Sequence, residues 1–236
     1  MSRKSNGGSP ILVAENSGAN GFPSRNLLKD QAYSALKDRI LRGDLEPGTF
    51  LSERQIAGWL AMSKTPIRAA LEKLEAEGFV TTSPQQGIVV RALSVHEIAD
   101  QFEIRLALET FVARAVSGRL TDEQISRLEA NLKAQKACLR QMNVQDSVRL
   151  DTEFHILFCR FLGNQEILKV MEQSRERIHR VILRVHEYNP ARLKAGYAEH
   201  CAIADAVIHG DAELAVRRVQ EHLEIGKQNL LSPRRG

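Results

Sequence analysis

The fold of the N-terminal part is decided by one segment, SKTPIRAALEKLEAEGFVTTSPQQGIVVR, residues 63–91. Its first half predicts a helix that begins at the Thr-Pro pair 65–66, with Thr as N-cap and Pro at the first helical position. The period changes beyond Gly78, because residues 79–82 and 88–90 are β-prone runs joined by a turn that contains Pro and Gly. The segment therefore predicts a helix followed by a β-hairpin.

Two further helices are predicted upstream of this segment. Apolar residues recur at four-residue spacing over residues 28–41, where they form one helical face. Ser52 and Gln55 have the spacing of a capping box, which starts a second helix that runs through Leu60. Three short helices and a hairpin within about 65 residues are typical of a winged helix-turn-helix.

The remainder of the chain predicts an all-helical domain. Helical periodicity without a strand signal runs through six segments, residues 95–118, 122–142, 147–162, 165–187, 191–209 and 212–230. Six amphipathic helices with short connections predict an antiparallel bundle that can enclose a cavity. We therefore expect a mainly α protein. Its predicted divisions are a flexible tail at 1–26, a winged helix-turn-helix at 27–91, an all-α bundle at 92–231 and a second flexible tail at 232–236.

The composition is typical of a globular protein and argues against several other classes. A net charge of +4 and a pI near 9.1 permit nucleic-acid binding without requiring it. The longest apolar stretches are far shorter than the roughly 18 residues of a membrane span, and the N-terminus lacks a signal-peptide core, so we expect a cytoplasmic protein. Cys138, Cys159 and Cys201 show no C-x-x-C spacing, which argues against disulfides or a thiolate zinc site.

Three motifs give the N-terminal part a family resemblance. They are ILRGDLEPG at residues 40–48, LSER at 51–54 and SKTPIRAAL at 63–71. Together they resemble the GntR family over residues 28–91, and the composite pattern is far more specific than a generic helix-turn-helix. The resemblance implies a transcriptional regulator that binds double-stranded operator DNA.

The predicted helix after residue 63 presents Lys64, Thr65 and Arg68 on its polar side, where they can reach bases and phosphates in a major groove. Arg68 is the first candidate for reading a base, and the resemblance adds Arg54 and the wing residue Gly87. The predicted DNA-binding set is Arg54, Ser63, Lys64, Thr65, Arg68 and Gly87. A solvated helix face is the default interpretation of a lone arginine, but the embedding motif favours DNA contact. Lysine in place of arginine at position 64, and two glutamines at the wing tip, leave the operator preference open.

Four residues of the helical part have the chemistry of a metal site. Asp151 and His155 are four residues apart and so share one helical face. His200 and His222 lie in the last two predicted helices. Three neutral imidazoles and one carboxylate suit Zn(II), Ni(II), Fe(II) or Mn(II), with one side open to a ligand. From the spacing alone, unrelated core or surface histidines remain the alternative.

A second resemblance favours the metal site. The motif DTEFH at 151–155 before LGN at 162–164, and the pattern that runs from Glu199 to Leu223, resemble the FadR-type effector domain of the GntR family. The resemblance implies a divalent metal, which we expect to be zinc, bound by Asp151, His155, His200 and His222. It also implies that a small carboxylate binds there as effector.

The same resemblance assigns an effector-binding arginine. Arg105 matches the family arginine; its alternative role is an i,i+4 ion pair with Glu109, worth only about 0.5 kcal/mol. Arg177 is a second effector-binding candidate, or else part of a polar stripe on its helix.

These features predict a ligand-responsive repressor that binds a palindromic operator as a homodimer. Two other classes stay open as alternatives, a metal-dependent enzyme and a metal-free helical interaction module fused to a DNA-binding domain. We expect no enzymatic activity, because the chain has no H-E-x-x-H motif and no assigned general base. The effector acid, the native metal, the operator sequence and the choice between repression and activation are left open by the sequence.

Overall fold

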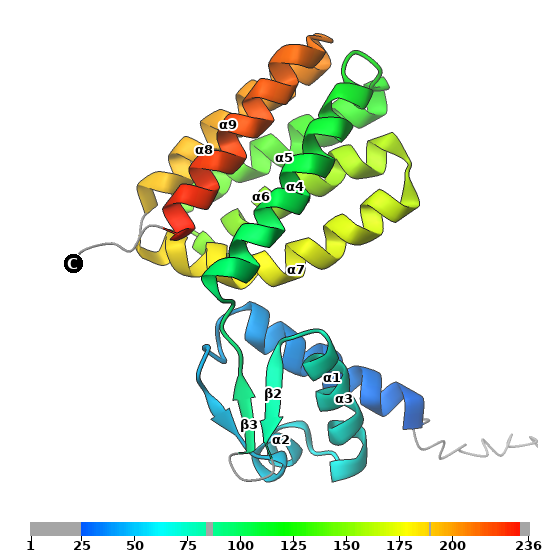
Figure 1. The fold of residues 1–236 in the computed structure, drawn as a ribbon, viewed down its shortest axis with the longest axis vertical. Coiled ribbons are helices and arrows are strands. Elements are labelled where there is room, and N and C mark those ends of the chain that lie inside the picture. Colours follow the sequence, from blue (N-terminus) through cyan, green and yellow to red (C-terminus); the bar gives the residue numbers. More distant parts are fainter. Residues whose placement is uncertain (1–24, 84–86, 189, 232–236) are drawn as a thin grey trace, which may run out of the picture.

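The computed structural model describes residues 25–83, 87–188 and 190–231. Figure 1 shows two parts that lie end to end, a small mixed part and a larger helical part. The described buried apolar residues form two separate clusters, one between residues 36 and 90 and the other between residues 98 and 223. The predicted flexible tails lie outside the described residues, except that Arg25 and Asn26 belong to the first helix.

The N-terminal part is a winged helix-turn-helix, as predicted. Its elements are helices α1 (Arg25–Leu41), α2 (Glu53–Leu60) and α3 (Lys64–Ala76) and strands β1 (Phe50–Leu51), β2 (Val80–Ser83) and β3 (Gly87–Val90). The strands form an antiparallel sheet in the order β1-β3-β2, with Thr81 opposite Val89 in the hairpin. Strand β1 was not predicted, because two residues are too few to show an alternating pattern.

The predicted apolar faces meet in the core of this part. Leu36 and Ile40 of α1, Ile56 of α2, and Ile67 and Leu74 of α3 are each at most 1% exposed. Burial of one such side chain contributes about 1.5–3 kcal/mol. The shared core fixes α2 against α3 and so determines which of their side chains face outward.

The helix starts agree with the sequence at α2 but not at α3. The Ser52 hydroxyl accepts from the Gln55 N–H at 3.2 Å, and the Gln55 side chain accepts from the Ser52 N–H at 2.9 Å, which confirms the capping box. The predicted N-cap Thr65 was wrong, because α3 already begins at Lys64, behind an extended Ser63 with ψ 164°. Pro66 is tolerated at the third position, since the first four N–H groups of a helix have no partner within it.

The C-terminal part is the predicted antiparallel bundle. Its helices are α4 (Val95–Val116), α5 (Asp122–Gln141), α6 (Val144–Leu162), α7 (Gln165–Tyr188), α8 (Pro190–Ile208) and α9 (Ala212–Leu231). Helix α6 begins three residues earlier than predicted, because the Asn143 side chain caps it by accepting from the Asp146 N–H at 3.0 Å. Within the described ranges, no helix combines the length and apolar character that crossing a membrane requires.

Helix α6 lies in the middle of the bundle. It packs against α4, α5, α7 and α8, and all side chains of residues 154–159 are buried. Helices α4 and α9 run side by side along one flank (Figure 1). A polar side chain on the inner face of α6 is therefore withdrawn from bulk water, and it needs partners from the surrounding helices.

Gly87 offers a test of how the wing packs against β1. Its backbone has φ +80°, and a Cβ at this position would lie 2.9 Å from the Leu51 carbonyl oxygen. We expect Gly87→Ala to lower the free energy of unfolding of this domain by at least about 1–2 kcal/mol, the cost of a left-handed alanine before any clash. Urea unfolding followed by circular dichroism measures the change.

Gly58→Ala on α2 is the matched control. A Cβ there meets nothing within 4 Å, so alanine should leave stability unchanged or raise it by up to about 1 kcal/mol. Equal stability of Gly87→Ala and the unaltered protein would contradict the described packing of the wing.

Candidate functional site

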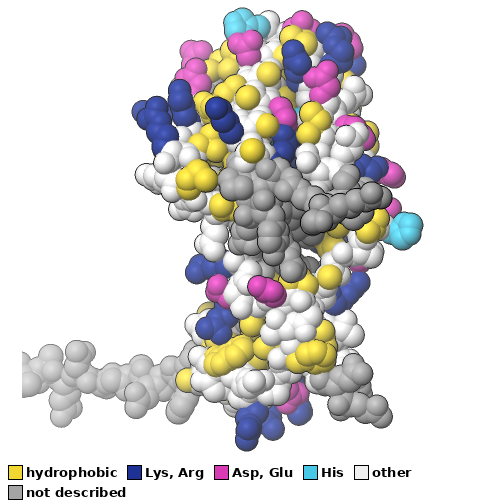
Figure 2. All heavy atoms as spheres, turned by 90° about the vertical axis from the view of Figure 1, so that its left-hand side faces the viewer, with side chains coloured by type: hydrophobic (Ala, Val, Ile, Leu, Met, Phe, Trp, Pro, Cys, Tyr) yellow, Lys and Arg dark blue, Asp and Glu magenta, His cyan; other side chains and the backbone are white. Residues whose placement is uncertain are grey.

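The outer surface of α2 and α3 carries most of the predicted DNA-binding side chains. Lys64, Thr65 and Arg68 are exposed on the first two turns of α3, Ser63 is exposed just before it, and Arg54 is exposed on α2. Figure 2 shows Lys and Arg side chains at the end of the molecule farthest from the helical bundle. Gly87, the remaining residue of the predicted DNA-binding set, begins β3 and is half-buried. The wing tip, residues 84–86, lies outside the described residues.

Three histidines and one aspartate meet inside the bundle. Asp151 and His155 come from neighbouring turns of α6, His200 comes from α8 and His222 from α9. Each offers one ligand atom, and these four atoms lie within 4.8 Å of one another. The Nε2 atoms of His155 and His222 are 3.2 Å apart, and His200 Nε2 lies 3.5 Å from Asp151 Oδ1. The structure thus brings together the four residues that the sequence singled out.

Each of these imidazole rings is held by a hydrogen bond on its far side. The pairs are His155 Nδ1 with Glu109 Oε2 at 2.7 Å, His200 Nδ1 with Gln135 Oε1 at 2.9 Å, and His222 Nδ1 with Glu199 Oε2 at 2.7 Å. Because carboxylate and amide oxygens accept hydrogen bonds, each Nδ1 carries the ring proton. Each Nε2 then presents a lone pair to the centre of the cluster.

Among the described residues, the four ligand atoms of the cluster are therefore all acceptors. His200 Nε2 is buried and makes no hydrogen bond within the described part of the chain, and the Asp151 oxygen 3.5 Å away is itself an acceptor. Burial, followed by the nearby His222 and His155, lowers the pKa of His200 well below its ordinary value, so this ring is neutral. Lone pairs that face one another without a proton repel, and a cation among them would remove this cost. The donor set fits a divalent metal ion.

Sequence reasoning missed the three residues that orient the rings. The spacing of Glu109 predicts only an ion pair with Arg105, and Gln135 and Glu199 are not predicted to contact a ring. A signal was present, because Leu128, Asn131 and Gln135 share one face of α5, and all three are buried. Polar side chains on an inward helical face indicate buried polar partners.

Two arginines donate hydrogen bonds to the glutamates that orient His155 and His222. Arg105 donates from Nε to Glu109 at 2.6 Å, and Arg192 donates from both Nη atoms to Glu199 at 2.5 and 2.6 Å. Burial alone would raise the pKa of each glutamate, but its arginine and its histidine outweigh burial and lower the pKa to about 2. Each ionised glutamate thus joins an arginine to a histidine of the cluster. The i,i+4 ion pair of Arg105 and Glu109, which the sequence offers as the alternative role of Arg105, is present and buried.

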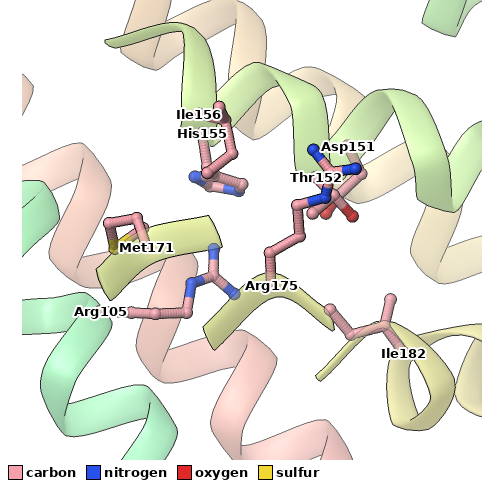
Figure 3. Close-up of a pocket in the computed structure, with 8 residues that line it drawn as sticks. All are labelled: Arg105, Asp151, Thr152, His155, Ile156, Met171, Arg175 and Ile182. Carbon is pink, nitrogen blue, oxygen red and sulfur yellow. The ribbon is translucent and has the colours of Figure 1, made fainter. Parts of the chain in front are cut away.

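A small cavity adjoins the cluster (Figure 3). It is lined from α4, α6 and α7 by Arg105, Asp151, Thr152, His155, Ile156, Met171, Arg175 and Ile182. Arg105 and Arg175 extend toward α6 in this view. The structure does not place Arg177 at the cavity, since its side chain is exposed. Two positions along a helix turn a side chain by about 200°, which explains why Arg175 occupies the place expected for Arg177.

Family models match both parts of the chain. The FCD domain matches residues 100–225, and the description "Bacterial regulatory proteins, gntR family" applies to the match over residues 28–90. Among related proteins, the HTH-type transcriptional repressor RspR of Escherichia coli strain K12 is 27% identical over 198 residues, 84% of this chain and 86% of that protein. The Nta operon transcriptional regulator of Aminobacter aminovorans is 30% identical over 180 residues, 75% of this chain and 84% of that protein. The gluconate operon transcriptional repressor of Bacillus licheniformis is 30% identical over 170 residues, 72% and 68% of the two chains.

Two solved structures share the fold. Escherichia coli McbR/YncC superposes with a TM-score of 0.74 at 22% identity, covering 86% of this chain and 96% of that one. A putative transcriptional regulator GntR from Rhodococcus sp. RHA1 gives a TM-score of 0.77 at 21% identity, covering 88% and 99%. The chain is a DNA-binding transcriptional regulator, not an enzyme, and it belongs to the GntR family, with an FCD domain behind its winged helix-turn-helix.

Proposed function

We propose that this regulator is a repressor controlled by a small carboxylate that binds at a divalent metal in the FCD domain. The observation that supports the proposal most is the convergence of three Nε2 lone pairs and one carboxylate, with every ring oriented by a hydrogen bond at its Nδ1. Repression is proposed because two of the relatives, RspR and the gluconate operon protein, are named as repressors.

DNA binding is assigned to the exposed surface of α2 and α3 and to the wing. Arg68 reads a base edge in the major groove, and residues 63–65 around the start of α3 reach neighbouring bases and phosphates. Arg54 adds a contact from α2. Gly87 allows the wing backbone to approach the minor groove.

The metal ligands in this proposal are Asp151, His155, His200 and His222. Zinc is the first candidate, with nickel, iron or manganese as alternatives, since all four ions accept imidazole and carboxylate ligands. When bound, the ion supplies Lewis acidity and an open position for an anionic ligand. The acceptors behind the rings keep the Nε2 atoms in place, and loss of such a partner typically lowers metal affinity about 10–100-fold.

The cavity of Figure 3 is the proposed effector site. The ion pairs Arg105–Glu109, Arg192–Glu199 and Arg175–Glu153 are each neutral, the last with its charged atoms 3.5 Å apart. A divalent ion beside the single carboxylate of Asp151 would therefore leave one net positive charge in the interior, which is unfavourable. One effector carboxylate would cancel this charge, so we expect monocarboxylates to be preferred over di- and tricarboxylates.

The helices that line this cavity also meet the DNA-binding domain. Helix α4 follows β3 after residues 91–94, and α7 contacts α1. An effector that favours one arrangement of α4 and α7 would change how the two DNA-binding domains of a dimer are held. The effector acts only to the extent that it binds one arrangement more tightly than the other.

The metal site is tested by His155→Ala and His222→Ala. We expect each variant to bind metal at least tenfold more weakly, because one ligand and its oriented lone pair are lost. DNA binding by the metal-free protein should be unchanged, since the two domains have separate cores. Elemental analysis and chelator competition on tag-free protein measure the first effect, and gel shifts measure the second.

His209→Ala is the control, because its side chain is 72% exposed and lies outside the cluster. Full metal occupancy in both cluster variants would contradict the site. Failure of the unaltered protein to take up any of the four metals would instead favour the metal-free interaction module.

The effector cavity is tested by a matched pair on α7. Arg175→Met removes a guanidinium from the cavity, whereas Arg177→Met removes one from an exposed position on the same helix. With acetate, pyruvate, malonate and succinate as probes on zinc-loaded protein, we expect Arg175→Met to weaken the tightest of them about ten- to a hundredfold, because a charge-assisted hydrogen bond is lost. Calorimetry that finds the loss in Arg177→Met instead would place the carboxylate elsewhere.

A homodimer is supported by the flank formed by α4 and α9. Leu106 and Phe111 of α4 are 38% and 55% exposed, beside a groove between the two helices. The groove is lined by Glu103, Glu221, Glu224 and Lys227. Arg114, Glu213 and Arg217 lie toward the opposite ends of the same two helices. A two-fold axis perpendicular to these two helices would place the more acidic end of one copy against the more basic end of its partner.

Phe111→Glu tests this interface. We expect it to convert a dimer of the 26.4 kDa chain to monomer at micromolar concentration in sedimentation experiments, because each copy would bury an unpaired carboxylate. Val170→Glu on α7, at a position 39% exposed, is the control and should leave the dimer intact. A dimer that survives Phe111→Glu would exclude this flank as the interface.

A further inference from the structure

The Arg68 guanidinium is held by a carboxylate on the neighbouring helix. Arg68 Nε donates to Glu53 Oε1 at 2.7 Å, and Arg68 Nη2 donates to Glu53 Oε2 at 3.0 Å. The arginine side chain is 61% exposed and the glutamate side chain 30% exposed. This two-point ion pair therefore lies on the surface to which DNA binding is assigned.

Both partners stand on fixed positions of the backbone. Glu53 is the first residue of α2, directly after the capping residue Ser52 and three residues before the fully buried Ile56. Arg68 follows the fully buried Ile67 on α3. The core of the domain thus sets the distance and direction between the two side chains.

A role in stability alone explains this pair poorly. Exposed ion pairs add little to stability, and a carboxylate on a DNA-binding surface repels phosphates. The geometry has a clearer consequence for recognition. The two bonds use Nε and one N–H of Nη2, which leaves the N–H groups of Nη1 and the second N–H of Nη2. Those two nitrogens form the planar fork that binds O6 and N7 of guanine.

We propose that Glu53 is a positioning residue that holds Arg68 in the orientation for bidentate binding to guanine. The inference rests on the base-reading role proposed for Arg68. Holding a flexible side chain before binding reduces the entropy lost when the complex forms. Glu53 thereby raises discrimination at one base pair in each half-site. Its negative charge, which repels phosphates, lowers the affinity for DNA of any sequence.

Glu53→Gln tests the proposal, because glutamine keeps the size of the side chain but removes its charge. An operator is first selected from a randomised duplex library with the full-length protein. Dissociation constants are then measured at one salt concentration for this duplex, for its single-base-pair variants and for a random-sequence duplex. Glu72→Gln, which removes an equal charge from an exposed position on α3, is the control.

We expect Glu53→Gln to lower the preference for one G·C pair in each half-site about five- to tenfold, within the range of one bidentate contact. Both glutamine variants should bind the random duplex more tightly, and Glu72→Gln should keep its base preferences. Arg68→Ala should lose the preference at the same base pair. Adding Glu53→Gln to Arg68→Ala should change that preference no further.

Three outcomes would overturn the proposal. If Glu53→Gln keeps the preference that Arg68→Ala loses, Glu53 has no positioning role, although Arg68 still reads a base. If the two variants alter different base pairs, Glu53 reads a base by itself. If Arg68→Ala keeps every base preference, both this inference and the base-reading role of Arg68 fail.

Discussion

The orientation of three imidazole rings is the constraint around which the FCD domain is built. A buried ring must satisfy its Nδ1 proton, and here an oxygen from α4, α5 or α8 accepts it for each ring. The helices that supply the rings and the acceptors must therefore keep a fixed mutual arrangement. The same hydrogen bonds leave the three Nε2 lone pairs and the Asp151 carboxylate facing one another, which gives the domain an interior that suits a cation.

The two acceptor glutamates also have a second partner. Glu109 joins His155 to Arg105, and Glu199 joins His222 to Arg192. An anion that binds at Arg105 in the proposed cavity would alter the charge felt by Glu109, and through it the donor strength of His155. Binding of metal and of carboxylate should then be coupled, and the coupling must be equal in both directions.

The DNA-binding domain also contains an arginine–glutamate pair, but solvent weakens the attraction between its two charges. In the bundle, the ionised Glu109 is buried and Glu199 is half-buried, so loss of one partner leaves a charge with little compensation from water. At the Arg68–Glu53 pair the side chains remain largely in water, where the attraction is weak and screened by salt. A weak pair suits a surface that must accept a new partner, because the arginine keeps its orientation without being withdrawn from the DNA.

The sequence by itself determined the elements of this protein and the chemistry of its main cluster. Periodicity and capping patterns predicted six helices of the bundle, the hairpin and the capping box at Ser52, because these depend on residues close together in the chain. The chemistry of the aspartate and the three histidines, strengthened by a family resemblance, predicted one site. Only the tertiary structure decided that Gln135 orients His200, that Arg175 and not Arg177 reaches the cavity, and that Glu53 holds Arg68. The physical reason is that a pattern along one helix shows which face is buried, whereas the residue opposite that face comes from another helix. Only packing fixes the rotation of that second helix about its axis and its position along it.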